Sequence, residues 1–383
     1  MRSGRSSRAT SGSSMRSPID YVESLSPWPK DGFGLDRIEA LLAELGRPQL
    51  RYPSIHVVGT NGKSTVARTI EELLAQSGLA VGAYLSPHVR AWSERIRVHG
   101  SDADFEAAIE RVREAAERLE ATQFELVTAA ALAEFAATAV DVAVVEAGLG
   151  GRYDATNVLR SPVQVLTNVS LEHTEVLGTT REAIAGEKLA VVQPGATVVL
   201  TEPEWEGLAL ENGAAEVVLA GRSNLAIAIS AAEAYLGRPV DGHVSVSLPG
   251  RLERVSDDPL EIWDGAHNLG GVGYVLARLP SERYTVVASI LADKDVEGML
   301  AAFSALGDRF VATRSSSTRA LSASDLAERA RRYFAEVEAV EDPVEALASA
   351  RAGGGPLLVT GSLYLLADLA KDESVRWRTL ARG

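Results

Sequence analysis

Hydrophobic and polar positions along the chain follow two periods in turn, which predicts alternating strands and helices. Short apolar runs, often β-branched and bounded by Gly, Pro or polar residues, are typical of buried strands. Between these runs, apolar residues recur every three to four positions, as on one face of a helix. In the first part of the chain we expect strands at residues 54–58, 80–85, 141–145, 162–169 and 196–200, and helices at residues 35–45, 66–77, 102–119, 180–192 and 224–236. This order predicts a mostly parallel sheet flanked by helices.

Pro249-Gly250-Arg251 interrupts the pattern, and strands and helices alternate afresh beyond it. There we expect strands at residues 260–263, 284–291, 309–313 and 357–360, and helices near residues 271–279, 296–306, 323–334 and 343–351. A chain of 383 residues exceeds the usual size of one core. We therefore predict an N-terminal domain at residues 18–248 and a smaller, Rossmann-like α/β domain at residues 249–383. Residues 1–17, rich in Arg and Ser without an acidic residue, are expected to be a disordered extension.

The strand at residues 54–58 runs into a glycine-bearing turn, and a helix follows directly. Backbone N–H groups of such a turn and the positive end of the helix dipole bind phosphate oxygens, and a lysine adds a positive charge. The longer nucleotide-binding pattern has a glycine where this chain has Val57, so only the shorter G-x-x-G-K-[ST] form is present. A surface turn with a chance Gly-Lys-Ser is the alternative. The flanking strand and helix favour a phosphate loop formed by Thr60, Asn61, Gly62, Lys63 and Ser64.

Ser86, Glu146 and His173 each come shortly after a predicted strand of the first sheet. The carboxyl ends of parallel strands lie along one edge of a sheet, where open α/β sheets bind ligands. Taken singly, Ser86-Pro87-His88 is typical of a turn, and a lone histidine is usually a structural residue. Together, the three side chains form an oxygen, oxygen and nitrogen set that could bind one Mg²⁺ near the phosphate loop.

Composition narrows the possible partners. A formal charge of −14 argues against broad binding to nucleic acid or to anionic membranes, both of which require clustered Lys and Arg. The chain has no cysteine, which excludes disulfides and thiolate metal sites and fits a cytoplasmic location. The longest apolar stretch, residues 129–147, contains Glu134 and Asp141, so it predicts a helix followed by a strand rather than a membrane span.

Several separate motifs, in order along nearly the whole chain, resemble the folylpolyglutamate synthase and dihydrofolate synthase branch of the Mur ligase superfamily. They are Gly34 to Ile38, His56 to Lys63, Ser86-Pro87-His88, Glu94-Arg95-Ile96, Glu146 to Asn157, His173, Glu187-Lys188, Pro249-Gly250-Arg251, Asp264 to Asn268, Asp293-Lys294-Asp295 and Gly361 to Tyr364. The glycine-rich run at residues 148–157 distinguishes this branch from the cell-wall Mur ligases. The chain departs from the family pattern at several positions and in the length of the span from Pro194 to Pro249, which is shorter than typical. The substituted positions are Ser64 for a glycine, Ala147 for a valine, Ser170 for a glycine, Glu172 for an aspartate and Leu269 for a proline.

The resemblance implies roles for individual residues. Thr60 to Lys63 would hold the ATP phosphates. Asn224, Arg251 and Asp264 would also contact ATP across the domain cleft. His267, expected to be catalytic, would lie close by. Mg²⁺ would be bound by Ser86, Glu146 and His173. Lys188 matches a lysine that is carbamylated in this family, and its carbamate would serve a second Mg²⁺. The pterin would be contacted by Thr122, Phe124, Glu125, Tyr153, Asp154 and Ala155.

The reaction that the resemblance implies joins L-glutamate to a dihydropteroate or reduced folate. The carboxylate of that acceptor would first take the γ-phosphoryl group of ATP, and the resulting acyl phosphate would react with the glutamate amine. Two alternatives are a Mur-type amino-acid ligase acting on another carboxylated metabolite and a nucleotide-binding homologue that has lost catalysis. We expect a cytoplasmic monomer, and the sequence leaves open whether one or both glutamate-joining activities are present.

Overall fold

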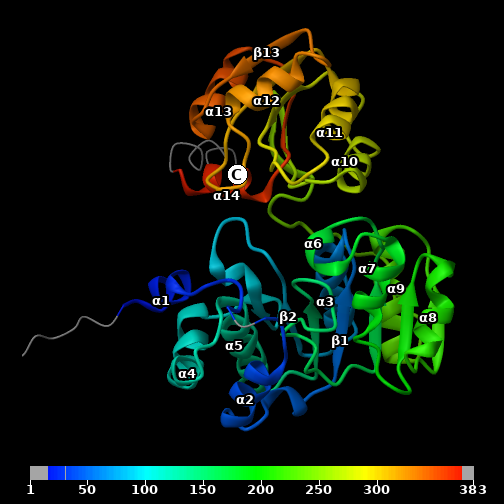
Figure 1. Ribbon diagram of the computed structural model, residues 1–383. Helices are drawn as coiled ribbons and strands as arrows, with labels where there is room; N and C mark the ends of the chain where they lie inside the picture. The colour runs from blue at the N-terminus through cyan, green and yellow to red at the C-terminus, as the bar shows by residue number, and fades with distance from the viewer. Residues whose placement is uncertain (1–15, 31, 373–383) are drawn as a thin grey trace, which may run out of the picture.

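The computed structural model describes residues 16–30 and 32–372, which form two α/β units (Figure 1). Sheet order in the first unit is β4-β3-β2-β5-β1-β6-β7-β8, and six of these strands are parallel. β3 and β4 pair antiparallel at one edge. The strands are β1 Ser54–Val58, β2 Val81–Tyr84, β3 Ile96–Val98, β4 Ser101–Asp102, β5 Val142–Glu146, β6 Val163–Leu166, β7 Thr197–Leu200 and β8 Glu216–Leu219. The predicted mostly parallel sheet is confirmed.

Helices of the first unit begin where polar side chains cap their free backbone N–H groups. Asp104, Thr180 and Ser223 each accept a hydrogen bond from the third residue beyond them, at the starts of α4, α7 and α9. The helices are α1 Pro18–Ser24, α2 Asp36–Glu44, α3 Lys63–Gln76, α4 Phe105–Arg118, α5 Gln123–Ala137, α6 Thr174–Leu177, α7 Arg181–Leu189, α8 Glu206–Glu211 and α9 Asn224–Leu236. Short 3-10 helices lie at Pro48–Leu50, Trp92–Arg95 and Pro203–Trp205.

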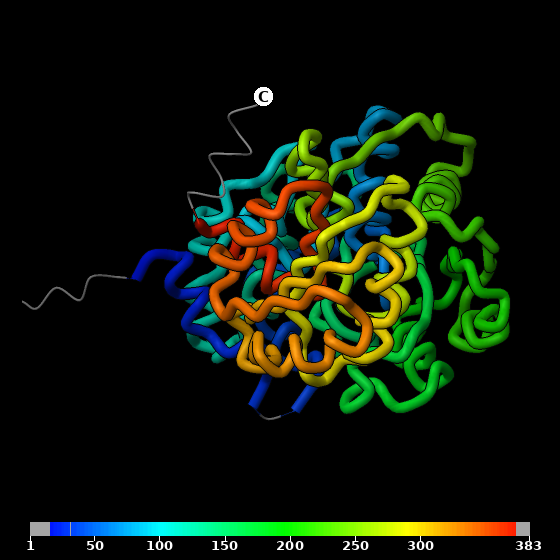
Figure 2. Tube along the Cα trace, turned by 90° about the horizontal axis from the view of Figure 1, so that it is seen from above, coloured from blue at the N-terminus to red at the C-terminus, as the bar shows by residue number. Residues whose placement is uncertain are grey.

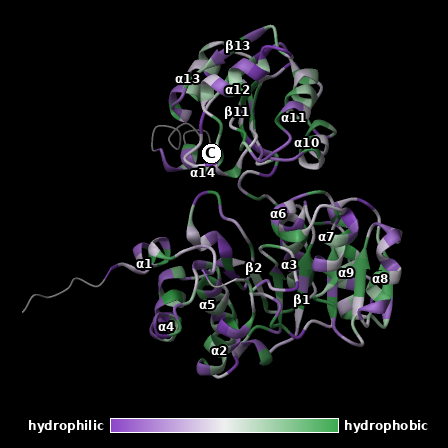
Figure 3. Cartoon of the chain, in the orientation of Figure 1, coloured by the Kyte–Doolittle hydropathy of each residue, from purple (hydrophilic) through white to green (hydrophobic). Residues whose placement is uncertain are grey.

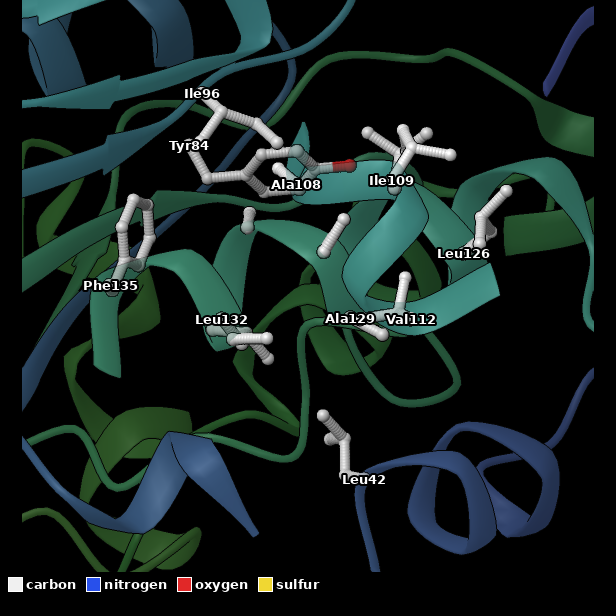
Figure 4. Packing of buried hydrophobic residues seen from close by; sticks show 14 of the residues in the cluster. Leu42, Tyr84, Ile96, Ala108, Ile109, Val112, Leu126, Ala129, Leu132 and Phe135 are labelled. Atoms are coloured by element: carbon white, nitrogen blue, oxygen red, sulfur yellow. The ribbon is translucent and has the colours of Figure 1, made fainter. Parts of the chain in front are cut away.

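Both faces of the first sheet are covered, because neighbouring residues of a strand point to opposite sides. On β5, Val142 and Val144 pack with α3 and α9, whereas Ala143 and Val145 pack with α4 and α5. Figure 4 shows this second layer, where Tyr84 meets residues of both α4 and α5. Hydropathy colouring shows apolar strands inside and polar outer helix surfaces (Figure 3). The buried runs of the sequence are therefore the central strands of the sheet.

The second unit contains a smaller sheet in the order β13-β12-β11-β14-β10-β9, parallel except for β9. Its strands are β9 Glu253–Asp257, β10 Leu260–Trp263, β11 Thr285–Ala288, β12 Arg309–Ala312, β13 Glu336–Ala339 and β14 Leu357–Thr360. Its helices are α10 Leu269–Leu276, α11 Val296–Phe303, α12 Ala323–Ala330, α13 Pro343–Ala352 and α14 Leu363–Lys371, with a 3-10 helix at Ser304–Leu306. This matches the predicted second α/β unit, while the exact domain boundary at residue 249 stays a prediction.

The second unit lies over the edge of the first sheet where its parallel strands end (Figures 1 and 2). Polar contacts join the two units at this edge. Asn268 Nδ2 donates to Asn61 Oδ1 at 3.1 Å, and Asn224 Nδ2 donates to the Tyr274 hydroxyl at 3.3 Å. Among the residues that the structure describes, no helix has both the length and the apolar character needed to cross a membrane.

Some predicted elements differ from the structure. Residues 92–98, to which no element was assigned from the sequence, form a 3-10 helix that ends at Arg95 and the strand β3, which begins at Ile96. The edge strands β4, β8, β9 and β13 were not predicted, since their largely exposed residues leave no buried apolar run. Helices α7, α11 and α12 end three to four residues before their predicted ends. The disordered extension predicted at residues 1–17 lies almost entirely outside the described residues.

Candidate active site

The turn between β1 and α3 has the backbone shape of a phosphate loop. Gly62 caps α3 with φ of +83°, and a Cβ there would lie 2.7 Å from Asn224 Oδ1. Gly59 has φ of +143°, and a Cβ there would lie 1.9 Å from Thr167 Oγ1. Both positions therefore require glycine, for conformation and for space. The predicted strand, loop and helix are confirmed, and Asn224 of α9 lies beside the loop.

Polar groups after β6 hold this loop in place. The Thr60 N–H donates to the Asn168 carbonyl at 2.9 Å, and the Asn61 N–H donates to Asn168 Oδ1 at 3.1 Å. Thr167 Oγ1 donates to the Asn61 carbonyl at 2.8 Å. Lys63 Nζ folds back onto the loop, 3.0 Å from the Gly59 carbonyl. The lysine is therefore positioned where a phosphate oxygen would replace a carbonyl as its partner.

Glu146, at the end of β5, is the central acidic group of the site. Its Oε2 accepts the Ser86 N–H at 3.0 Å, and its Oε1 accepts the Ser64 hydroxyl at 2.9 Å. Burial raises the pKa of Glu146, while the nearby charge of Lys63 opposes that shift. A buried carboxylate flanked by two serines is a donor set suited to a hard cation such as Mg²⁺. Two of the three predicted metal ligands are thus brought together.

His173 lies in the loop after β6, directly before α6. It is the N-cap residue of α6, with φ of +45°. Burial lowers the pKa of His173, and the charges of Lys294, Lys63 and Lys188 add to this shift, while the charge of Glu172 opposes it. Within the described residues, no hydrogen bond joins His173 to Glu146 or Ser86, and no group of three or more His, Cys, Asp or Glu side chains is arranged to hold a metal. The assignment of His173 to the same ion as Glu146 therefore stays a prediction.

Lys188 is almost completely buried and points at the phosphate loop. Its Nζ donates to the Gly59 carbonyl at 2.9 Å and to Glu172 Oε1 at 2.8 Å. Burial lowers the pKa of Lys188 to about 8. Although burial alone would raise the pKa of Glu172, the charges of Lys63 and Lys188 lower it to about 2. Glu172, noted in the sequence only as a departure from the family pattern, is thus a buried ion-pair partner of Lys188.

The second unit contributes groups from the loop after β10. Asp264 accepts the backbone N–H groups of Leu252 and Ala266, each at 2.8 Å, so it fixes the turn before α10. The His267 Nδ1 lies 2.8 Å from the Gly265 carbonyl, which requires the proton on Nδ1 and leaves Nε2 as the free nitrogen. Burial lowers the pKa of His267 to about 4. His267 is therefore neutral near pH 7.

Lys294, in the motif Asp293-Lys294-Asp295, had no role predicted from the sequence. The charge of Lys294 lowers the pKa of both His173 in the first unit and His267 in the second. The charge of Arg251 likewise reaches Glu146 and opposes the raised pKa of that carboxyl. These effects between residues far apart in the sequence follow from the tertiary structure.

The residues predicted to contact the pterin make hydrogen bonds, an ion pair and a ring contact within the first unit. Thr122 and Glu125 form a capping box at the start of α5: Glu125 Oε2 accepts the Thr122 N–H and hydroxyl, both at 2.8 Å. Arg37 pairs with the same carboxylate at 3.3 Å. Phe124 is half-buried, with its ring centroid 6.1 Å from that of Tyr84. Their role in binding a pterin stays a prediction.

Asp154 shapes the glycine loop that follows β5. Its Oδ2 accepts the Leu149 N–H at 2.7 Å, and its Oδ1 accepts the Thr156 N–H at 3.0 Å. The neighbouring Tyr153 side chain is exposed, and Ala155 is buried. Thr156 also bonds His56 of β1 at 2.8 Å, so the loop is tied to the strand that leads into the phosphate loop. Sequence reasoning missed this link.

Family models match both units of the chain. The Mur ligase middle domain matches residues 57–235, and the Mur ligase, glutamate ligase domain matches residues 250–363. A curated relative, the dihydrofolate synthase/folylpolyglutamate synthase of Escherichia coli (strain K12), is 32% identical, with 95% of this chain and 96% of the relative covered.

Two solved structures have the same fold. E. coli FolC in complex with DHPP and ADP has a TM-score of 0.83 and 29% identity, with 94% of this chain and 97% of that chain covered. The bifunctional folylpolyglutamate synthase/dihydrofolate synthase from Yersinia pestis, complexed with AMPPNP and Mn ion, has a TM-score of 0.81 and 29% identity, with 91% and 95% covered.

The fold, the phosphate loop and these matches define the class of this protein, that of the ATP-dependent acid–amino-acid ligases. Within that class, the chain belongs to the dihydrofolate synthase/folylpolyglutamate synthase family of Mur ligases. The resemblance identified from the sequence motifs is confirmed.

Proposed function

We propose that this protein uses ATP to activate the carboxylate of a pteroate or folate as an acyl phosphate and joins L-glutamate to it. The observation that supports this most directly is that the phosphate loop contacts groups from both units. Ser64, next to Lys63, bonds the buried Glu146 at 2.9 Å, and Asn61 bonds Asn268, next to His267, at 3.1 Å. Such an arrangement places cations and a metal-binding carboxylate where phosphoryl transfer gathers negative charge.

The residues divide the work of the first step. The loop N–H groups and Lys63 hold the ATP phosphates, and the carboxylate of the acceptor approaches the γ-phosphorus. Mg²⁺ held by Ser86 and Glu146, with the Ser64 hydroxyl beside them, would neutralise charge on the phosphates. Arg251 and Lys294 add positive charge from the second unit. The second unit covers the site and so excludes water, which would otherwise hydrolyse the acyl phosphate.

A carbamylated Lys188 and a second Mg²⁺ are part of the proposal. Carbamylation needs a neutral amine, and the buried Lys188 loses its proton more readily than an exposed lysine. The carbamate would have to share space with Glu172, which now lies 2.8 Å from Nζ. His173, close enough for its pKa to respond to the charge of Lys188, would be the other protein ligand of the second ion.

For the acceptor, we propose activity on both dihydropteroate and a reduced folate. The two acceptors place their reactive carboxylates one glutamate apart, so their pterins would occupy different positions relative to Lys63. Phe124 and Asp154 are the residues we assign to the pterin of dihydropteroate. The predicted cytoplasmic location and monomeric state are not needed for this proposal and stay predictions.

The test is ADP release by the purified protein with ATP, Mg²⁺, L-glutamate and one acceptor at a time. We expect release that requires both glutamate and a pterin acid, and none from Lys63→Ala. Release with glutamate and only some other carboxylated metabolite would favour a different Mur-type ligase. No release with any acceptor, despite ATP binding, would indicate a homologue without catalysis.

A further inference from the structure

Three asparagine side chains connect the first unit, the phosphate loop and the second unit. Asn168 follows β6, Asn61 lies in the turn between β1 and α3, and Asn268 stands directly before α10. Asn168 bonds the backbone of Asn61, and Asn268 bonds its side chain. Two asparagines for which the sequence predicted no role therefore contact the loop proposed to hold the ATP phosphates.

Asn168 holds the backbone of Asn61 through both of its polar groups. The Asn168 Oδ1 accepts the Asn61 N–H at 3.1 Å, and the Asn168 Nδ2 donates to the Asn61 carbonyl at 2.9 Å. The same carbonyl accepts the Thr167 hydroxyl at 2.8 Å. A side-chain amide that pairs with the N–H and the carbonyl of one residue takes the place of a neighbouring strand. The backbone of Asn61 is therefore fixed by residues of the first unit.

Asn268 links the second unit to the side chain of Asn61. Its Oδ1 accepts the Gly271 N–H at 2.8 Å and so caps α10. Because a backbone N–H can only donate, this bond determines which end of the Asn268 amide faces the helix. The other end, Nδ2, donates to Asn61 Oδ1 at 3.1 Å. A single side chain thus begins a helix of the second unit and contacts the phosphate loop.

The bond from Asn268 also determines the orientation of the Asn61 amide. In the described part of the chain this is the one hydrogen bond of the Asn61 side chain, so the two Nδ2 donors stay available. Asn61 Nδ2 lies close to the first turn of α10, because a Cβ added to Gly270 would lie 3.1 Å from it. Two N–H donors at the phosphate loop suit a phosphate oxygen, whereas an amide turned the other way would present its oxygen and repel the phosphate.

We propose that Asn268 is a positioning residue for the nucleotide. When the second unit lies over the first, Asn268 orients the Asn61 amide so that Nδ2 donates to a phosphate oxygen of ATP, and Asn168 keeps the Asn61 backbone in the matching position. The phosphate loop is then complete only with the second unit in place. This inference rests on the proposed use of ATP, and it assigns a residue that acts through Asn61.

A double-mutant cycle tests whether Asn268 acts through Asn61. Asn268→Ser is chosen because serine also caps a helix, while its side chain is too short to reach Asn61. We expect Asn268→Ser to weaken the binding of AMPPNP with Mg²⁺ by about fivefold, as for the loss of one neutral hydrogen bond, and Asn61→Ala to weaken it at least as much. The double variant should bind like Asn61→Ala, because Asn268 then has no partner to act on. Isothermal titration calorimetry measures all four proteins without turnover.

Two further variants separate this role from folding. Asn268→Ala removes the cap of α10 as well, so it should unfold at a lower temperature than Asn268→Ser while weakening AMPPNP binding to the same extent. Asp342→Ser is the matched control in the second unit, because Asp342 Oδ1 caps α13 by accepting the N–H groups of Val344 and Glu345. It should bind AMPPNP like the wild type. Thermal unfolding of each variant checks that it folds.

A loss of affinity in Asn268→Ser that disappears in the Asn61→Ala background supports the inference. Wild-type affinity of Asn268→Ser would overturn it, as would losses that multiply in the double variant, because Asn268 would then act independently of Asn61. If the wild type binds AMPPNP and shows this coupling but joins no glutamate, the proposed function fails and the role of Asn268 stands. If it joins glutamate without the coupling, the proposed function stands and the role of Asn268 fails.

Discussion

At the scale of single residues, the site depends on charged groups that are buried and paired. Glu146 is held by the Ser64 hydroxyl and the Ser86 N–H, and Lys188 by Glu172 and a carbonyl of the phosphate loop. A buried charge that loses its partner lowers the stability of the fold, so each of these pairs restricts which side chains and protonation states are tolerated around it. These pairs also place both groups within reach of the phosphates that the loop would bind.

Glu146→Gln and His173→Ala should each raise the Mg²⁺ concentration needed for half-maximal activity. Each change removes a proposed ligand, and a lost ligand weakens binding of a hard cation by about tenfold or more. Mg²⁺ titrations of ADP release measure the shift, and Mn²⁺ binding followed by electron paramagnetic resonance provides a check independent of turnover. Unchanged titrations in both variants would show that the ion binds elsewhere.

Lys188 should carry a carbamate when the protein is equilibrated with labelled bicarbonate, and the label should increase as the pH rises through about 8. The pKa of this lysine is about 8, so the neutral amine that reacts with CO₂ becomes the main form above that pH. Carbon-13 NMR of the wild type and of Lys188→Ala measures the signal. Lys188→Ala should also regain part of its activity with a small carboxylic acid. A wild type without label at any pH would contradict the carbamate.

At the scale of elements, the glycine loop after β5 and the phosphate loop after β1 are connected. His56, at the centre of β1, bonds Thr156, and Thr156 bonds Asp154 at 2.5 Å. Because β1 pairs with β5, the two loops leave neighbouring strands at the same sheet edge. A change in one loop can therefore displace the other.

His56→Gln should make the protein less sensitive to acid. Burial lowers the pKa of His56 to about 4 in the fold, against about 6.5 when it is unfolded. Between these values the unfolded chain binds the proton and the folded protein does not, so stability falls as the pH drops from about 6.5 to 4. Thermal unfolding from pH 7 to 4 measures this. The wild type should lose more stability over that range than the variant, and parallel curves would contradict the idea.

Asp154→Ala should impair the use of dihydropteroate more than the use of tetrahydrofolate. The family resemblance assigns Asp154 to the pterin of dihydropteroate, so the variant removes a proposed acceptor for pterin N–H groups. Steady-state kinetics with each acceptor measures the difference. An equal loss on both acceptors would mean that Asp154 acts only by shaping the glycine loop.

At the scale of the whole molecule, the two units share a hydrophobic contact as well as polar ones. Val89, from the loop after β2, is buried in a cluster of the second unit that includes Trp263 and Leu366. Its neighbour Arg90 pairs with Glu253 of β9. The same loop carries the proposed metal ligand Ser86, so the position of the second unit is coupled to the metal site.

Val89→Ala should lower the free energy of unfolding by about 2 kcal/mol, because it removes two buried methyl groups and leaves a cavity. It should also weaken activity by loosening the loop that carries Ser86. Denaturant unfolding and the Mg²⁺ titration measure the two effects. Val176→Ala, at an exposed position of α6, is the control and should change neither. Wild-type behaviour of Val89→Ala would show that the contact does not connect the units.

The sequence by itself determined the central strands, the phosphate loop and the family. Buried strands leave continuous apolar runs, and a loop that binds phosphate needs glycines and a lysine at fixed spacing, so both are local properties of the chain. The tertiary structure decided which distant groups meet. Three contacts depend on how the strands and the two units are placed. Lys188 pairs with Glu172, Asn268 of the second unit bonds Asn61 of the phosphate loop, and arginines of the first unit line a cavity with Arg251. The exposed edge strands were not predicted because a neighbouring strand fixes their backbone pairing. Their own residues therefore need no apolar period.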